Sequence, residues 1–272
     1  MSESPVTAKS IAWLIACAVL LAAGLPAAAA EDTADDKWTF RGEAYLWAPA
    51  IKGHTSAADP IDIQFSDIFE NLGIAAMGTL AARKDKVTLF TDLIYLDIEG
   101  DYKSTANIIH RPIETRVDAE MNAFIATLGG AYAFMEIDNT VLDAFAGARY
   151  LWVKTDLDFD IGQKISKSAS LSGHVWDGIV GMRGQTRLND KWSLLYYGDV
   201  GTGQSDLTWQ ALGAFSYKFE KFEGVLGYRY LRWNFEEGKA LGKDYDNLYV
   251  TGPYAGVKFD FLRGKMFLNP FE

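Results

Sequence analysis

The sequence of 272 residues is poor in cysteine and histidine, with one cysteine, Cys17, and three histidines. We expect Cys17 to be removed with the N-terminal segment, which would leave no disulfide, no thiolate nucleophile and no cysteine-based metal site. Basic residues are outnumbered by acidic ones, 26 to 36, and the formal net charge is −10. Because a basic patch is lacking, we expect no nucleic-acid partner.

Long apolar runs are also lacking, except for Ile11–Leu25 at the N-terminus, which follows Lys9. The small residues Ala28–Ala30 before Glu31 fit the cleavage site of a secretory signal peptide. We therefore predict a cleaved signal peptide over 1–30. The alternative is a lipoprotein, because the four residues that end at Cys17 resemble a lipoprotein box. No later run approaches the about 20 apolar residues that a membrane helix needs.

Period-two alternation of apolar and polar residues dominates the rest of the chain, where aromatic residues are also frequent. Such alternation predicts β-strands with one apolar and one polar face, and about ten candidate strands can be delimited. The predicted strands are Trp38–Trp47, Ile74–Arg83, Val87–Ile98, Val117–Phe134, Val141–Phe159, Val175–Leu188, Trp192–Thr202, Leu207–Phe219, Phe222–Phe235 and Leu248–Phe261.

The connections between these strands alternate in length. Short turns are predicted at Asp85–Lys86, Met135–Asn139, Asn189–Lys191 and Glu220–Lys221, and long polar loops at Ala48–Gly73, Glu99–Arg116, Asp160–His174 and Glu236–Asn247. Only Gly203–Asp206 is short where a long loop is expected. Short periplasmic turns and long extracellular loops are typical of bacterial outer-membrane barrels. We therefore predict an all-β protein, a closed antiparallel up-and-down transmembrane β-barrel of about ten strands, with eight or twelve as alternatives.

Three segments resemble small outer-membrane β-barrel proteins. They are Glu43–Pro49, Asp92–Asp97 and the closing strand Tyr249–Phe261, which ends on an aromatic residue. The sequence is similar to a group of proteobacterial outer-membrane barrel proteins of the OmpA/OmpW-like superfamily. The resemblance implies a barrel over 31–261 in the bacterial outer membrane, with outer-membrane lipids, lipopolysaccharide and the barrel-assembly machinery as partners. It implies no activity and no oligomeric state.

Two features depart from this pattern. The chain continues past Phe261, and we predict a short periplasmic tail over 262–272. Pro253 cannot donate a hydrogen bond to a neighbouring strand, so we expect a bulge or an unpaired site in the closing strand.

Charged residues at inward-facing positions of the predicted strands form the first candidate site. Alternation predicts that the following charged side chains point into the lumen: Arg41, Glu43, Asp92, Asp118, Glu120, Asp143, Arg149, Asp177, Arg183, Asp199, Arg229, Lys258 and Asp260. Mixed charges in a low-dielectric tube should pair. They could form a plug of ion pairs, or the selectivity lining of a narrow pore. Because a barrel of about eight strands has room only for side chains, we expect the lumen to be mostly filled by charged and polar side chains.

The histidines His54, His110 and His174 lie in or beside three predicted loops. They could form a metal site, or supply a base to a serine such as Ser172. Alternatively, these side chains never meet.

Two further segments could act at the predicted rim. Asp156–Asp160 hints at a calcium loop, but Ile161 and Lys167 occupy positions that require glycine and glutamate. We therefore expect a solvated acidic stripe. Ser66–Leu72 has helical spacing, and predicts either a lid or a short helix packed on the rim.

No catalytic motif is recognisable, since Gly-x-Ser-x-Gly, His-Glu-x-x-His and the glycine-rich phosphate loop are all absent. We therefore predict a non-enzymatic structural or surface-interaction barrel, without catalytic residues, cofactor or metal. A narrow passive porin-like channel for ions or small solutes is the alternative. A lipid hydrolase or acyltransferase at the rim is the second alternative.

Overall fold

The computed structural model describes residues 38–54, 61–63, 66, 70–108, 111–161, 165–235 and 246–261. The predicted signal peptide and the predicted tail lie outside the described residues. The described part contains one 12-stranded sheet. The strands are β1 (Thr39–Trp47), β2 (Ala50–His54), β3 (Ile61–Ile63), β4 (Leu72–Lys84), β5 (Val87–Ile108), β6 (Arg111–Ile137), β7 (Thr140–Ile161), β8 (Ile165–Arg187), β9 (Trp192–Gly203), β10 (Leu207–Lys218), β11 (Glu223–Asn234) and β12 (Asn247–Phe261).

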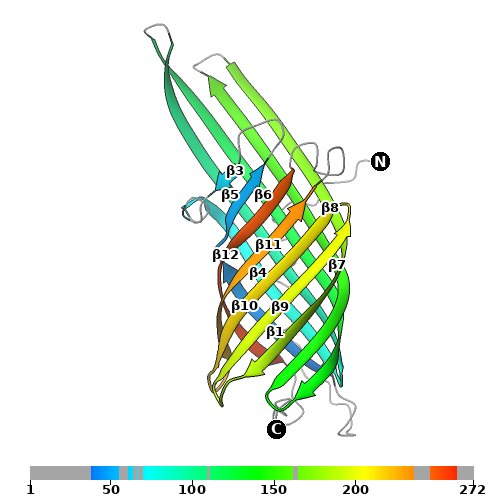
Figure 1. The fold of residues 1–272 in the computed structure, drawn as a ribbon. Helices are drawn as coiled ribbons and strands as arrows, with labels where there is room; N and C mark the ends of the chain where they lie inside the picture. Colours follow the sequence, from blue (N-terminus) through cyan, green and yellow to red (C-terminus); the bar gives the residue numbers. More distant parts are fainter. Residues whose placement is uncertain are drawn as a thin grey trace, which may run out of the picture.

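The sheet closes on itself because β1 pairs with β12 on one side and with β4 on the other. Each strand from β4 to β11 pairs with the next strand in sequence, so the wall is an up-and-down antiparallel barrel (Figure 1). The predicted barrel of about ten strands is thereby confirmed. Strand β2 pairs with β12 beyond the end of β1, and β3 pairs with β2. No helix in the described ranges has the length and apolar character to cross a bilayer.

Two of the predicted short turns have left-handed backbone at an aspartate. Asp85 has a φ of 52° and Asp138 a φ of 46°. Asp85–Lys86 and Asp138–Asn139 are therefore two-residue hairpin turns, whose twist matches that of the flanking strands. Aspartate tolerates this conformation better than most residues, because its short polar side chain bonds locally.

Two predicted long loops, Glu99–Arg116 and Asp160–His174, are wrong. In the structure β5 and β6 stay paired up to Ile108 and Arg111, and β7 and β8 stay paired up to Ile161 and Ile165. A membrane strand needs only about 9–11 residues. The two hairpins therefore form an extension that projects beyond the other strands at one end of the barrel (Figure 1). Strands outside lipid have no apolar outer face, and so their sequence resembles that of a polar loop.

The irregularity predicted at Pro253 is found in the neighbouring wall strand, opposite Pro253. The wall strand next to β12 is interrupted between Trp47 and Ala50, and the Ala48 amide donates to the Pro253 carbonyl over 2.9 Å. A Cβ atom on Gly252 would lie 2.0 Å from the Ala48 carbonyl oxygen. Only glycine fits this close approach of two backbones.

The outer surface of the wall is an apolar band between aromatic rows. Phe215 and Val180 are 52% and 57% exposed, whereas Ser216, beside Phe215 in sequence, is 2% exposed. At the turn end of β10, Tyr217 packs against Trp192 with ring centroids 4.9 Å apart. Near the other end, Trp209 stacks on a tyrosine of β11. Apolar residues flanked by aromatic girdles suit a surface that contacts lipid.

Candidate functional site

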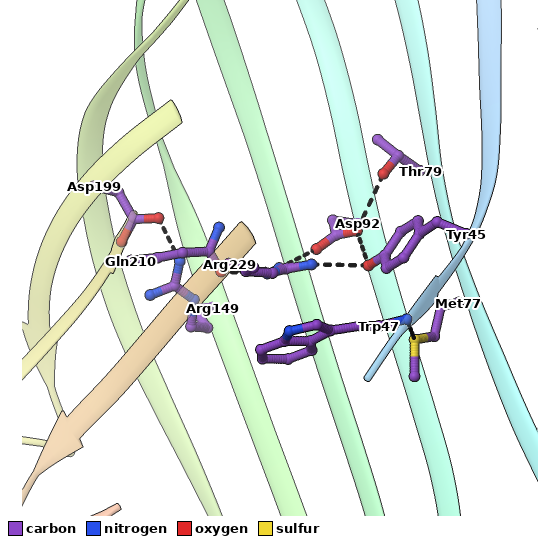
Figure 2. A network of polar contacts seen from close by, with 9 residues as sticks. All are labelled: Tyr45, Trp47, Met77, Thr79, Asp92, Arg149, Asp199, Gln210 and Arg229. Carbon is purple, nitrogen blue, oxygen red and sulfur yellow. Dashed lines mark hydrogen bonds and ion pairs between the residues drawn. The ribbon is translucent and has the colours of Figure 1, made fainter. Parts of the chain in front are cut away.

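A layer of ion pairs and hydrogen bonds crosses the lumen around Arg229 of β11 (Figure 2). Arg229 Nε donates to Gln210 Oε1 over 3.1 Å, and Nη1 donates to the Tyr45 hydroxyl over 2.9 Å. Its Nη2 forms an ion pair with Asp92. The guanidinium group therefore connects β11 to β10, β1 and β5.

Asp92 of β5 is the anion that completes this layer. The Tyr45 hydroxyl donates to Asp92 Oδ1 over 2.6 Å, while it accepts the bond from Arg229. Thr79 Oγ1 of β4 donates to the same carboxylate oxygen over 3.1 Å. Asp92 thus accepts from three side chains on three strands, which holds its charge in one place.

A second buried ion pair, between Arg149 of β7 and Asp199 of β9, adjoins the first. Both side chains are 0% exposed. Arg149 Nη1 also donates to Thr208 Oγ1 over 3.0 Å. Asp199 is the register partner of Gln210, which bonds to Arg229. The two pairs therefore form one polar layer, here called the mid-lumen network.

An apolar cluster fills the lumen beside the mid-lumen network. Every wall strand contributes a buried or partly buried residue to it. Leu231, Trp233 and Val175 are 0% exposed, although they point inward. Inward side chains of an open channel would be accessible to water, so the lumen is filled at this level. Trp47 joins the two layers, because its ring lies 5.0 Å from the Arg229 guanidinium carbon.

The charged inward positions alone did not indicate this apolar cluster. The signal was present, because Leu231 and Trp233 share the alternation of Arg229 along β11. The lumen is therefore filled by apolar as well as polar side chains, and the expectation of a mostly charged and polar filling left out the apolar part.

Six of the remaining predicted lumen charges lie in three smaller ion pairs. Lys258 Nζ lies 3.6 Å from Glu43 Oε2, and Arg41 Nε lies 2.9 Å from Asp260 Oδ1. The Arg183 Nε donates to Asp143 Oδ2 over 3.0 Å. Asp177 accepts bonds from the Ser205 amide and hydroxyl over 2.9 and 2.8 Å.

The predicted inward position of Glu120 is wrong. Glu120 is exposed, whereas Ile125 and Thr127 on the opposite face of β6 are buried. Its carboxylate accepts a bond from Asn122 Nδ2 over 3.0 Å. The inward face of β6 consists of the odd-numbered residues, so the alternation assumed for Glu120 was shifted by one residue. The side chain of Asp118 lies outside the described part.

The predicted acidic stripe is partly described, at Asp156 on the outer face of the extension. Lys154 forms an ion pair with Asp156. Hydrogen bonds from Lys154 and Ser170 lower the pKa of Asp156, and the bond with Asp156 raises the pKa of Lys154. The side chains of Asp158 and Asp160 lie outside the described part. Most side chains of the predicted helix Ser66–Leu72 lie outside it as well.

The three histidines are not brought together by the described residues. His174 is exposed on β8, with its ring centroid 6.4 Å from that of Tyr150. His54 lies on β2, and three strands separate β8 from β12, the wall strand that pairs with β2. His110 lies outside the described residues. Within the described ranges, no group of at least three histidine, cysteine, aspartate or glutamate residues could hold a metal ion.

No family model and no curated protein matches the chain. Among solved structures, it is similar to the outer membrane protease OmpT from Escherichia coli, with 10% identity, 86% of this chain and 99% of that chain covered, and a TM-score of 0.47. It is also similar to the translocator domain of the autotransporter NalP from Neisseria meningitidis, with 17% identity, coverage of 95% and 100%, and a TM-score of 0.42. The attachment invasion locus protein Ail of Yersinia pestis matches with 9% identity, coverage of 82% and 98%, and a TM-score of 0.33.

Similarity at this level assigns no activity, substrate or partner to the chain. The barrel predicted from the resemblance is confirmed by the closed sheet. Its finer assignment to the OmpA/OmpW-like superfamily stays a prediction.

Proposed function

We propose that this chain is an integral outer-membrane barrel with a non-enzymatic structural or surface-interaction role, and that its lumen is closed to solutes. The filled lumen carries this proposal. In the mid-lumen network, each of the two buried arginines has a carboxylate partner. An ion crossing the barrel would have to displace these pairs and then pass the apolar cluster, where desolvation is costly.

The apolar band and its aromatic rows support a location in the outer membrane. We propose that a signal peptide over 1–30 is cleaved after export, and that the barrel-assembly machinery then inserts the strands. With short turns facing the periplasm, the β5–β8 extension projects from the cell surface. It offers the largest surface for contacts with lipopolysaccharide or with other cells.

Liposome swelling tests the closed lumen. Folded protein in liposomes should give the swelling rate of empty liposomes in isosmotic solutions of arabinose and of smaller solutes. The double variant Trp233→Ala, Leu231→Ala removes two fully buried side chains of the apolar cluster. If wild-type liposomes swell faster than empty ones, the protein is a channel and the proposal is wrong. Swelling of the double variant alone would support the apolar cluster as the barrier.

A further inference from the structure

Three aromatic side chains form a row on the outer face of β10, β11 and β12. Trp209 stacks on Tyr230 with ring centroids 4.6 Å apart, and Tyr230 stacks on Tyr249 at 6.1 Å. The next residues along two of these strands, Leu231 and Val250, are buried in the core. The ring stack therefore lies on the lipid side of the wall.

The height of the ring stack matches one membrane interface. On β10, Trp209 is followed by exposed Phe215 and then by Tyr217, which packs on Trp192 at the turn end. Roughly 8 residue steps of about 3.3 Å, along a strand tilted by about 40°, span about 20 Å. Such an interval is close to the apolar height of an outer-membrane barrel, so the ring stack belongs at the outer-leaflet head groups.

Arg232 lies in the same outer row. It is the register partner of both Trp209 and Tyr249 and lies two residues beyond Tyr230 on β11. Its side chain is half-buried, and Nε donates to Asn234 Oδ1 over 2.8 Å. Asn234 is neutral, so this bond itself does not compensate the positive charge.

Five other arginines of the wall have a carboxylate partner. Those pairs are Arg41–Asp260, Arg83–Glu136, Arg149–Asp199, Arg183–Asp143 and Arg229–Asp92. Arg232 forms no ion pair with any residue that the structure describes. A guanidinium in the same outer row as aromatic rings at head-group level is suited to bind an external anion, with its two Nη groups as a bidentate donor.

We propose that Arg232 and the ring stack of Trp209, Tyr230 and Tyr249 bind a phosphorylated glycolipid of the outer leaflet. The Arg232 Nη groups would donate to a phosphate, and the ring stack would lie against the sugar and the upper acyl chains. The inference rests on the proposed outer-membrane location, which puts these residues in the outer leaflet. It is independent of whether the lumen conducts.

Binding can be measured with folded protein in neutral detergent. Lipid A carrying two phosphates is titrated, and the temperature at which the SDS-resistant folded band is lost is followed on gels. Wild-type protein should show a saturable rise in this temperature. Arg232→Gln keeps the length and polarity of the side chain, and should raise the half-saturating concentration by about tenfold. Arg232→Lys should bind with intermediate strength, because a lysine cannot donate bidentately.

Lys191→Gln is the matched control, because Lys191 lies 5.9 Å from the Tyr217 ring at the opposite interface. This variant should bind as the wild type does. Without lipid, each variant must lose its folded band at the wild-type temperature; if Arg232→Gln alone fails this check, Arg232→Lys and the ring variant Trp209→Leu replace it. Dephosphorylated lipid A should give no shift.

Three results would overturn the proposal. The first is equal half-saturation for Arg232→Gln and wild type, and the second is equal loss of binding in Lys191→Gln. The third is a full shift with inorganic phosphate at the same concentration, which would make this a site for free anions rather than for a lipid. Liposome swelling of the same wild-type sample tests the closed lumen separately, so the two proposals can fail independently.

Discussion

Replacing Arg229 by methionine should be among the most damaging single substitutions in the lumen. Methionine retains much of the side-chain length but removes the donors to Gln210, Tyr45 and Asp92. The Asp92 carboxylate would stay largely buried, with a side-chain exposure of 15% and only the hydroxyls of Tyr45 and Thr79 to stabilise its charge. Leaving one partner of a buried pair uncompensated costs about 3–5 kcal/mol.

A double variant separates the effect of the buried charge from the loss of packing. Adding Asp92→Asn to Arg229→Met removes the uncompensated charge, while the asparagine oxygen can still accept from Tyr45 and Thr79. The double variant should therefore lose only about 1–2 kcal/mol, which is about 2–3 kcal/mol less than the loss expected for Arg229→Met alone. Arg83→Met is the control, because Arg83 and Glu136 form a pair at the rim with exposures of 29% and 39%. Its loss should cost at most about 1 kcal/mol.

The free energy of unfolding can be measured by urea titration of the barrel in lipid vesicles, with tryptophan fluorescence and gel mobility as independent probes. A cost below about 1 kcal/mol for Arg229→Met would refute the reasoning. Equal costs for the single and the double variant would also refute it, since the buried charge would then contribute nothing.

Three further substitutions test the wall and the extension. Val180→Arg places a charge on the lipid face and should cost about 2–4 kcal/mol in vesicles by urea titration; no change would put Val180 outside the bilayer. Gly252→Ala should be strongly destabilising, because the new Cβ would lie 2.0 Å from a carbonyl oxygen, whereas Gly213→Ala has nothing within 4 Å and should be tolerated. Lys154→Gln should raise the pKa of Asp156 in a carboxyl NMR titration, because the hydrogen bond from Lys154 that lowers this pKa is lost. In the wild type, the contact between Lys154 and Asp156 persists at neutral pH and weakens as the pH falls through the lowered pKa of Asp156.

Alternation along the chain was sufficient to predict the wall. Arg149, Asp199 and Arg229 were expected to face the lumen, and all three are buried. The turns at Asp85 and Asp138 were predictable as well, because hairpin turns favour aspartate and asparagine.

The extension was not predictable from the same pattern. Residues that leave the bilayer no longer need an apolar outer face, so the criterion for a strand fails where β5 to β8 continue into water. The contacts across the lumen could not be predicted from the alternation either. Tyr45 and Arg229 are far apart in sequence and meet only because the sheet closes, and the stagger of the strands at closure is not encoded in a period of two. Alternation identified most of the side chains that point inward, with Glu120 as an exception, but not which of them meet.

Single-channel recording in a planar bilayer tests the filled lumen most directly. Folded protein should insert without producing discrete conductance steps in 1 M KCl, at a protein density at which a sixteen-stranded porin gives many. Insertion must be verified in the same preparation by the mobility difference between boiled and unboiled samples. Reproducible steps of uniform size from the wild-type protein would contradict a lumen closed by the mid-lumen network and the apolar cluster.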